Sequence, residues 1–548
     1  MGMNEKQTLT IPYFAEKSFS KYGQHNALGF VGEPVLTYND VKRSVDAVMA
    51  LLEKYSIGRG DKVAILSGSM PNWGITYLAI VSMGAVVVPV LPDFTSDEVS
   101  NVLRHSEATA IFVSGALTGK LAGYSSETLR LAITLDDFAI ISGYNGAGYE
   151  PSARPEKEYP VEEEDLAALI YTSGTTGKSK GVMLTHKNLC FTAEKTLTIQ
   201  RVNDQDVFLS ILPLSHTYEQ TLGLILPIFN GASVYYLRKP PTPAVLLPAL
   251  SAVRPTTMLT VPLIMEKIYF NKIAPAFHES KLLSILYRMS FFRKILNKAA
   301  GKKLYKTFGG RLRFFGIGGA KLNPTVEKFL IEAKFPYAIG YGLTETSPLL
   351  AGTCVGSPRL GSTGPAMEGV TLKISNPDPI TGEGEVWAKG DNVMRGYYND
   401  PSMTADAITP DGWFRTGDLG VLNKNGYLSL KGRLKNMIVG SSGQNIYPEE
   451  IESVINDFSL VIESLVVQKK GKLVAMVHLN MDELQAKYQS MKKELTEQAE
   501  VKIDEYLEEI RKYVNSKVNK FSQVQLVVLQ PEPFQKTATL KIKRFLYC

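Results

Sequence analysis

Apolar runs of strand length alternate with helical patterns along the first part of the chain. Residues 61–66, 85–90 and 108–113 are apolar runs that predict buried strands, and the patterns at 72–83 and 96–105 predict helices between them. Strands that alternate with helices at this spacing are typical of an α/β fold with a parallel sheet. We therefore predict a large N-terminal domain with parallel α/β sheets.

Residues 63–92 contain no charged side chain. A membrane-spanning helix has the same property. Glycine and proline interrupt the run, among others at Pro71, Gly74, Gly84 and Pro89. We interpret it as a strand, a helix and a strand of the parallel sheet, and expect no membrane-spanning helix.

The pattern changes in the later part of the chain. Residues 385–398 and 412–430 have the alternation and turn residues of antiparallel strands, which predicts a smaller β subdomain. Three kinds of pattern follow beyond residue 434. They predict a helix that starts at 448, two strands within 465–479 and a long charged helix over about 481–520.

These changes in pattern predict two domains. We expect a large N-terminal domain over residues 1–434, and a small C-terminal α+β domain over residues 435–548.

Composition excludes several classes of protein. The chain has 548 residues with 60 basic and 54 acidic side chains, and a net charge of +6 is too slight a bias to indicate nucleic-acid binding. Its three cysteines, Cys190, Cys354 and Cys548, lie too far apart for a disulfide framework or a zinc site. The first residues carry no apolar signal core, so the predicted location is the cytoplasm.

Residues 278–313 depart from this even balance, because many basic side chains surround one acid, Glu279. Leucine, isoleucine and phenylalanine lie between the basic positions at spacings that can share a helix face. A basic amphipathic helix can lie on an anionic membrane surface, here at the inner face, whereas a solvated helix packed on its own domain remains the alternative.

The stretch 171–181, YTSGTTGKSKG, is suited to holding phosphate. Its glycines allow backbone N–H groups to form a concave anion site, and hydroxyl and lysine side chains add donors and charge. It is not a Walker A loop, because Gly174 stands three residues before Gly177 instead of five. A flexible polar linker is the alternative. The predicted ligands are Thr172, Ser173, Gly174, Thr175, Thr176, Gly177 and Lys178.

His216 follows the apolar strand that we predict to end at Pro213. A lone histidine is more often structural, but ligand sites in parallel sheets lie beyond the carboxyl ends of strands, so its position makes His216 a candidate catalytic residue, with a structural histidine as the alternative.

Together, these motifs resemble the adenylate-forming superfamily, which includes acyl-CoA synthetases, nonribosomal peptide adenylation domains and firefly luciferase. The matching segments are YTSGTTGKSKGVMLTH (171–186), LPLSHTYE (212–219), GYGLTET (340–346), GYYNDP (396–401), GWFRTGD (412–418), GRLKNMIVGSSGQNIYPEEIE (432–452) and KTATLKIKR (536–544).

The resemblance implies a two-step reaction. A carboxylate attacks the α-phosphate of ATP to give an acyl-adenylate and pyrophosphate, and a thiol then takes the acyl group. Positioned donors and a metal ion supply most of the rate in such phosphate chemistry. The implied cofactors are ATP and Mg²⁺, with coenzyme A as co-substrate.

The resemblance also assigns site residues. Tyr341 offers a ring for adenine, beside Gly319, Ala320 and Gly342. Thr344 donates to the α-phosphate, and Glu345 is the implied Mg²⁺ ligand. Asp418 accepts from the ribose hydroxyls, and Arg433 donates to the same sugar.

The C-terminal motifs carry the remaining roles. Lys541 is the implied catalytic lysine of adenylation, although Leu540 stands where relatives usually have glycine. Lys435 matches the hinge about which the small domain rotates between the half-reactions, and that rotation would bring Ser442 and Gly443 to the site of thioester formation.

LPLSHTYE and KTATLKIKR most resemble long-chain fatty acyl-CoA synthetases, which implies a fatty acid and CoA as substrates. Two alternatives stay open. One is a fatty acyl-AMP ligase that loads a carrier protein, and the other is an inactive acyl-nucleotide or lipid-binding protein.

Overall fold

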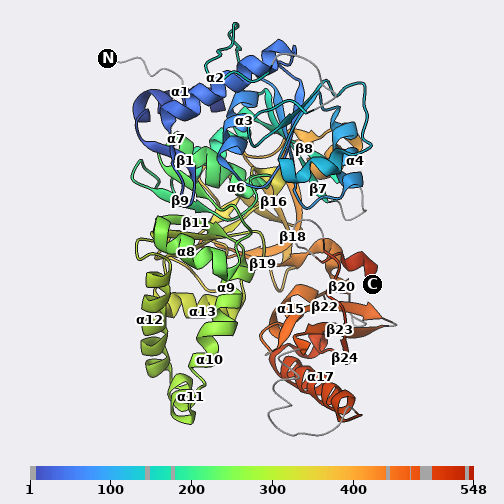
Figure 1. Cartoon of the computed structure of the whole chain (residues 1–548). Helices are drawn as coiled ribbons and strands as arrows, with labels where there is room; N and C mark the ends of the chain where they lie inside the picture. Colours follow the sequence, from blue (N-terminus) through green and yellow to red (C-terminus); the bar gives the residue numbers. More distant parts are fainter. Residues whose placement is uncertain are drawn as a thin grey trace.

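The computed structural model describes residues 8–141, 148–173, 179–439, 445–458, 460–469, 471–481, 497–536 and 542–548. Two large sheets organise the N-terminal part, and a separate C-terminal region follows them (Figure 1). The predicted α/β class with parallel sheets is confirmed.

The first large sheet has eight strands. Pairing is parallel from β1 to β13 and antiparallel at the two edges. In spatial order the strands are β14 (Ala351–Gly352), β13 (Tyr337–Tyr341), β12 (Phe314–Ile317), β11 (Thr257–Thr260), β9 (Val207–Ser210), β10 (Ser233–Tyr236), β1 (Asn26–Phe30) and β2 (Leu36–Thr37).

The second large sheet has seven strands. It contains the three strands predicted from the apolar runs, and β7 continues into the antiparallel strand β8. Its order is β17 (Gly396–Tyr397), β8 (Ser179–Thr185), β7 (Leu166–Ser173), β4 (Val86–Val90), β3 (Lys62–Leu66), β5 (Ala110–Val113) and β6 (Leu131–Thr134).

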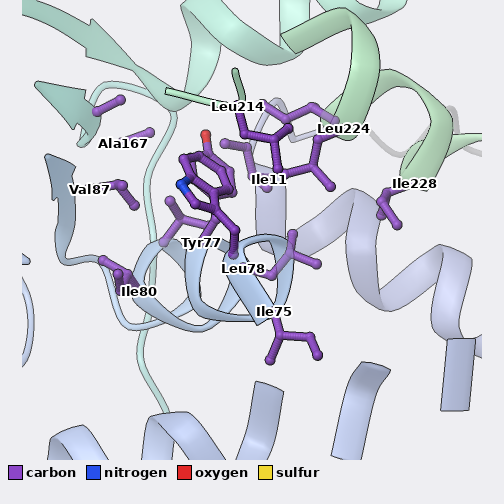
Figure 2. Close-up of a cluster of buried hydrophobic side chains, with 14 of the residues drawn as sticks. Ile11, Ile75, Tyr77, Leu78, Ile80, Val87, Ala167, Leu214, Leu224 and Ile228 are labelled. Carbon is purple, nitrogen blue, oxygen red and sulfur yellow. The ribbon is translucent and has the colours of Figure 1, made fainter. Parts of the chain in front are cut away.

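The helix α3 (Pro71–Ser82) explains the uncharged run at 63–92. It contacts β4 of one sheet and β1 of the other, so nearly all of its side chains are buried. Figure 2 shows Tyr77 and Leu78 of α3 within this core, near Val87 of β4. A helix that is apolar on every face is one buried on every side. In the part of the chain that the structure describes, no helix has the length and apolar character needed to cross a membrane.

Other helices surround these sheets. The chain enters some of them through capping residues such as Thr37 and Thr95, whose hydroxyls accept the N–H of the third helical residue. They are α1 (Ile11–Tyr22), α2 (Tyr38–Lys54), α4 (Ser96–Ser106), α5 (His186–Thr196), α8 (Pro243–Val253), α13 (Pro324–Ala333) and α14 (Pro401–Ala407).

A smaller antiparallel sheet carries β15 (Thr371–Ser375), β16 (Gly384–Lys389), β18 (Phe414–Leu422) and β19 (Leu428–Arg433). It confirms the predicted β subdomain, with one difference. Residues 385–398 do not stay in this sheet, because β17 pairs with β8 of the seven-stranded sheet. The amide of Asn188 in α5 donates to the backbone oxygens of Asp391 and Val393, which holds the crossing segment.

The C-terminal region has its own core. Leu507, Ile510 and Val514 of α17 are buried in it, as their helical spacing predicts. Its elements are β20 (Ile438–Val439), β21 (Asn445–Ile446), α15 (Pro448–Ile455), β22 (Val461–Lys469), β23 (Lys472–Leu479), α17 (Glu497–Lys517) and β24 (Leu526–Leu529). The domain boundary at 434/435 stays a prediction.

The basic segment 278–313 does not form one helix. It contains α11 (Lys281–Arg288) and α12 (Ser290–Thr307), which meet at Met289. Met289 has an extended backbone, with φ −82° and ψ 121°, and this interrupts the helical hydrogen bonding.

Candidate active site

The turn after β13 carries three of the predicted site residues, Gly342, Thr344 and Glu345. Tyr341 ends the strand, and Thr344 and Glu345 begin a short 3₁₀ turn, η4 (Thr344–Thr346), where both are half-buried. A Cβ on Gly342 would lie 1.7 Å from the carbonyl oxygen of Pro348, so glycine is required there. Predicted ligands of nucleotide phosphate and metal thus share one tight turn.

Asn392 holds this turn from outside. Its amide donates to the backbone oxygen of Thr346 at 3.2 Å and to that of Leu349 at 2.7 Å. The hydroxyl of Thr346 accepts the N–H of Leu343 at 3.0 Å within the turn. These bonds fix the backbone that presents Thr344 and Glu345.

Glu345 is positioned by Tyr397 of β17. The Tyr397 hydroxyl donates to Oε1 of Glu345 at 3.0 Å, and the N–H of Met394 donates to the Glu345 backbone oxygen at 2.9 Å. Burial raises the pKa of Tyr397, so its hydroxyl keeps the proton that it donates. β17 also pairs with β8, which brings the Glu345 turn against the strand that leaves the phosphate loop.

Tyr341, Asp418 and Arg433 form a connected cluster. The buried Tyr341 hydroxyl donates to Oδ2 of Asp418 at 2.8 Å, and Nε of Arg433 lies 2.8 Å from Oδ1 of the same carboxylate. Asp418 and Arg433 face each other across β18 and β19. Burial, followed by the nearby Asp418 charge, raises the pKa of Tyr341, which therefore stays a neutral donor.

Gly319 and Ala320 follow the end of β12, next to β13 in the sheet. Gly319 has φ +85°, a conformation that favours glycine, and both residues are exposed. Both residues thus lie at the carboxyl end of the strand next to the one that ends at Tyr341.

The phosphate-loop segment is a β-hairpin in its described part. Thr172 of β7 pairs with Lys180 of β8, so the loop leaves the end of a buried strand. The Tyr171 hydroxyl and Nδ1 of His105 are 2.8 Å apart, which anchors the base of the hairpin. Ser173 closes β7, although its side chain, like Gly174, Thr175, Thr176, Gly177 and Lys178, lies outside the described residues.

His216 stands immediately before the short helix α6 (Thr217–Glu219) and is half-buried. Its neighbour Tyr218 lies against β12, where a Cβ on Gly316 would meet the Tyr218 hydroxyl at 3.0 Å. The segment therefore packs on the strand that leads to Gly319, while a catalytic role for His216 stays a prediction.

Glu219, the last residue of α6, is a buried carboxyl group that the sequence interpretation did not single out. Burial raises its pKa to about 8. Its Oε2 has no hydrogen-bond partner among the described residues. The side chain lies over Gly223, where a Cβ would come 2.6 Å from Oε1. Glu219 is therefore a proton-carrying group inside the fold at neutral pH.

The remaining predicted residues lie in or near the C-terminal region. Lys435 is exposed in the 3₁₀ turn η5 (Leu434–Asn436) that follows β19. Ser442, Gly443 and Lys541 lie outside the described residues, so their roles stay predictions.

Contacts between the C-terminal region and the rest of the chain include several polar ones. The Asn323 amide and the Thr325 hydroxyl both donate to Asp457, the latter at 3.2 Å. The Tyr447 hydroxyl donates to Glu383 at 2.6 Å. Polar contacts of this kind suit an interface that forms and separates.

The structure adds two positioning residues that the sequence interpretation did not assign. Tyr397 lies inside the GYYNDP motif, which signalled the family but gave no role for its tyrosine, and Asn392 precedes that motif. A motif marks a segment, whereas the hydrogen bonds that each side chain makes depend on the strand pairing of β17 with β8.

Comparisons with known proteins identify the family of the chain. Residues 15–398 match the family model described as AMP-binding enzyme. The chain is 29% identical to the peroxisomal long chain acyl-CoA synthetase 6 of Arabidopsis thaliana, over 82% of this chain and 69% of that protein. It is 28% identical to long-chain-fatty-acid–CoA ligase 1 of Cavia porcellus, over 93% and 80% of the two chains.

Among solved structures, ATP-bound MatB from Rhodopseudomonas palustris has the same fold, with a TM-score of 0.75 at 23% identity over 98% of both chains. The family match covers well over half of the chain and includes the phosphate-loop hairpin, the Glu345 turn and Tyr397. The chain belongs to the AMP-binding enzyme family.

Proposed function

We propose that the chain is an ATP-dependent long-chain fatty acid–CoA ligase. In the first step a carboxylate oxygen bonds to the α-phosphorus of ATP, and the bond to pyrophosphate breaks. In the second step the thiol sulfur of CoA bonds to the acyl carbon, the bond to AMP breaks, and the thiol proton leaves. Family membership and the similarity to acyl-CoA ligases over most of the chain support this proposal.

The observation that carries the proposal is the cluster of Tyr341, Asp418 and Arg433 beside the Glu345 turn. We assign the exposed edge of this cluster to the adenosine of ATP, with the Tyr341 ring against adenine and Asp418 accepting from the ribose. Arg433 then donates to the same sugar. The buried side of Asp418 is already held by its two partners, so the carboxylate is positioned before the nucleotide binds.

Glu345 is the proposed protein ligand of Mg²⁺. In the described part of the chain, no three His, Cys, Asp or Glu side chains gather into a metal site. Proteins commonly hold Mg²⁺ by one or two carboxylates together with substrate phosphates, so a single glutamate in the turn fits this ion. The ion, when bound, neutralises phosphate charge, while Tyr397 orients the carboxylate and Thr344 donates to the α-phosphate.

Lys541 is the proposed donor to the charge that grows during attack on the α-phosphate. Loss of one well-aimed donor costs about 3 kcal/mol, or ~100-fold in rate. We further propose that residues 435–548 rotate about Lys435 between the half-reactions and bring Ser442 and Gly443 toward the CoA thiol. Catalytic groups on both sides of a moving interface are a known way of separating two steps.

The proposed substrate is a fatty acid with a long apolar chain. We also propose that the enzyme takes this acid from a membrane surface. CoA is the proposed acceptor. A carrier-loading acyl-AMP ligase would share the first step and differ in the second.

Thioester formation with CoA alone tests the proposal. The purified full-length protein, palmitate, ATP and Mg²⁺ should give palmitoyl-CoA with no carrier protein present. Accumulation of palmitoyl-AMP without thioester would assign the chain to the acyl-AMP ligases, and absence of both products would support the binding-protein alternative.

A further inference from the structure

A helical projection extends from the eight-stranded sheet. It is built from α9 (Pro262–Ile268), α10 (Ala274–Ala276), α11 and α12, and Figure 1 shows α11 at the end farthest from the N-terminal helices. The tip surface is defined here as residues 281–295. It comprises all of α11 and the first turns of α12.

Large apolar side chains are exposed on the tip surface. Leu282 and Phe291 are each 68% exposed, and α11 buries none of its residues. Ile285, Met289, Phe292 and Ile295 add to the same surface. So many exposed apolar groups within one short segment mark an interaction site and not ordinary surface scatter.

The base of the projection is packed, so the tip is not an incompletely formed core. Asn297, Gly301 and Leu304 of α12 are buried. A Cβ on Gly301 would lie 2.6 Å from that of Ala333, which shows how closely α12 approaches α13. At the boundary between tip and base, Arg293 of the tip surface pairs with Glu332 of α13, with Nη2 2.9 Å from Oε1.

Basic side chains are exposed on the same segment as the apolar ones. Lys281, Arg288, Lys294 and Lys298 are exposed, and Glu279 is the one acid within 278–313. Arg293 belongs to this basic segment but is already neutralised by Glu332. Exposed apolar side chains interspersed with cations match an anionic bilayer, in which the apolar groups enter the acyl boundary and the cations meet lipid phosphates.

We propose that the tip surface, residues 281–295, docks the protein on anionic lipid bilayers. A second copy of the chain is a poorer occupant, because two such surfaces would bring like charges together. The sequence predicted membrane contact anywhere within residues 278–313, and the proposed docking surface is confined to the first half of that segment. It does not depend on ligase activity, since binding needs no substrate.

Flotation of the full-length protein with vesicles tests this inference. Vesicles of phosphatidylglycerol and phosphatidylcholine are compared with pure phosphatidylcholine, without ATP, CoA or acid. One variant carries Leu282→Ser, Ile285→Ser and Phe291→Ser, and its control carries the exposed replacements Leu360→Ser, Ile380→Ser and Phe521→Ser.

A second pair of variants separates charge at the tip from charge at the base. Lys281→Glu, Arg288→Glu and Lys294→Glu reverse the tip, whereas Lys302→Glu, Lys303→Glu and Lys306→Glu make the same change in net charge on the packed half of α12. Thioester formation from detergent-solubilised palmitate is measured in parallel for every variant.

The protein should partition onto anionic vesicles, and both tip variants should lose about tenfold or more of that partitioning. The two controls should keep most of it, and activity on solubilised acid should be unchanged in all four. Absent vesicle binding, equal losses in tip and control variants, or concentration-dependent self-association through the tip in place of binding would overturn the proposal. If the unmodified chain forms no thioester from detergent-solubilised palmitate, that result would instead contradict the proposed function.

Discussion

Nε of Arg433 lies 2.8 Å from Oδ1 of Asp418, and the two residues face each other in register across β18 and β19. Asp418 is buried, whereas the Arg433 side chain is 42% exposed. The pair therefore presents a fixed carboxylate at the edge of the site, with Tyr341 behind it.

Asp418→Asn should weaken nucleotide binding. An amide oxygen accepts from Tyr341 and from ribose less strongly than a carboxylate, and a charged hydrogen bond contributes about 2 kcal/mol. We expect the KM for ATP to rise roughly 30-fold. Isothermal titration with AMP measures the same loss directly, and Tyr341→Phe, which keeps the ring, should lose less. An unchanged AMP affinity would show that Asp418 does not bind the ribose.

Tyr397→Phe should raise the Mg²⁺ concentration needed for half-maximal pyrophosphate release by about fivefold. The variant removes the hydroxyl that orients Glu345 and keeps the ring, and one neutral donor is worth about 1 kcal/mol. Tyr398→Phe is the matched control, because its hydroxyl donates to Glu107. If the two variants need the same Mg²⁺ concentration, Tyr397 does not orient the proposed metal ligand.

Asp457→Ala should loosen the C-terminal region. The carboxylate accepts from Asn323 and Thr325, and its loss leaves the Asn323 amide without that partner. We expect about tenfold faster proteolysis in the linker around Lys435 and a changed ratio between adenylation and thioester rates. Asp504→Ala, an exposed change in α17, is the control. If both variants resist protease like the unmodified chain, Asp457 does not hold the interface.

Glu219 makes the folded state less stable at high pH. Its pKa of about 8 exceeds the usual 4.5, so between these values the folded chain binds more protons than the unfolded chain. The contribution to stability is complete below the unfolded pKa and is lost as the pH rises to about 8. The free energy of unfolding therefore falls over this window by on the order of 5 kcal/mol.

Glu219→Gln should remove this dependence. Its urea midpoint, followed by tryptophan fluorescence, should fall less than that of the unmodified chain between about pH 5 and pH 8, because the amide does not titrate. Glu127→Gln changes an exposed carboxylate and should behave like the unmodified chain. Parallel pH curves for all three proteins would contradict a buried, protonated Glu219.

The sequence predicted the central strands of the seven-stranded sheet and the helices between them, because each has a local signal. β3, α3, β4, α4 and β5 follow from apolar runs and helical spacing within single segments. The break between α11 and α12 at Met289 has no proline or glycine to signal it, so one helix was expected there.

The sequence predicted the site residues that lie inside recognisable motifs. It did not predict the residues that position them, because their contacts depend on pairing between distant segments. Glu345 and Asp418 belong to recognisable motifs. Tyr397 reaches Glu345 because β17 leaves the antiparallel sheet and pairs with β8, a contact between residues far apart in sequence. Asn392 holds the Glu345 turn for the same reason.

Pyrophosphate release across a series of carboxylic acids tests the central claim most directly. The full-length protein is supplied with ATP, Mg²⁺ and CoA, and with acetate, octanoate, palmitate or benzoate. We predict release that depends on the acid, is greatest with palmitate, and is matched by an equal amount of palmitoyl-CoA. Greatest release with acetate or benzoate, or no acid-dependent release at all, would contradict a long-chain fatty acid–CoA ligase.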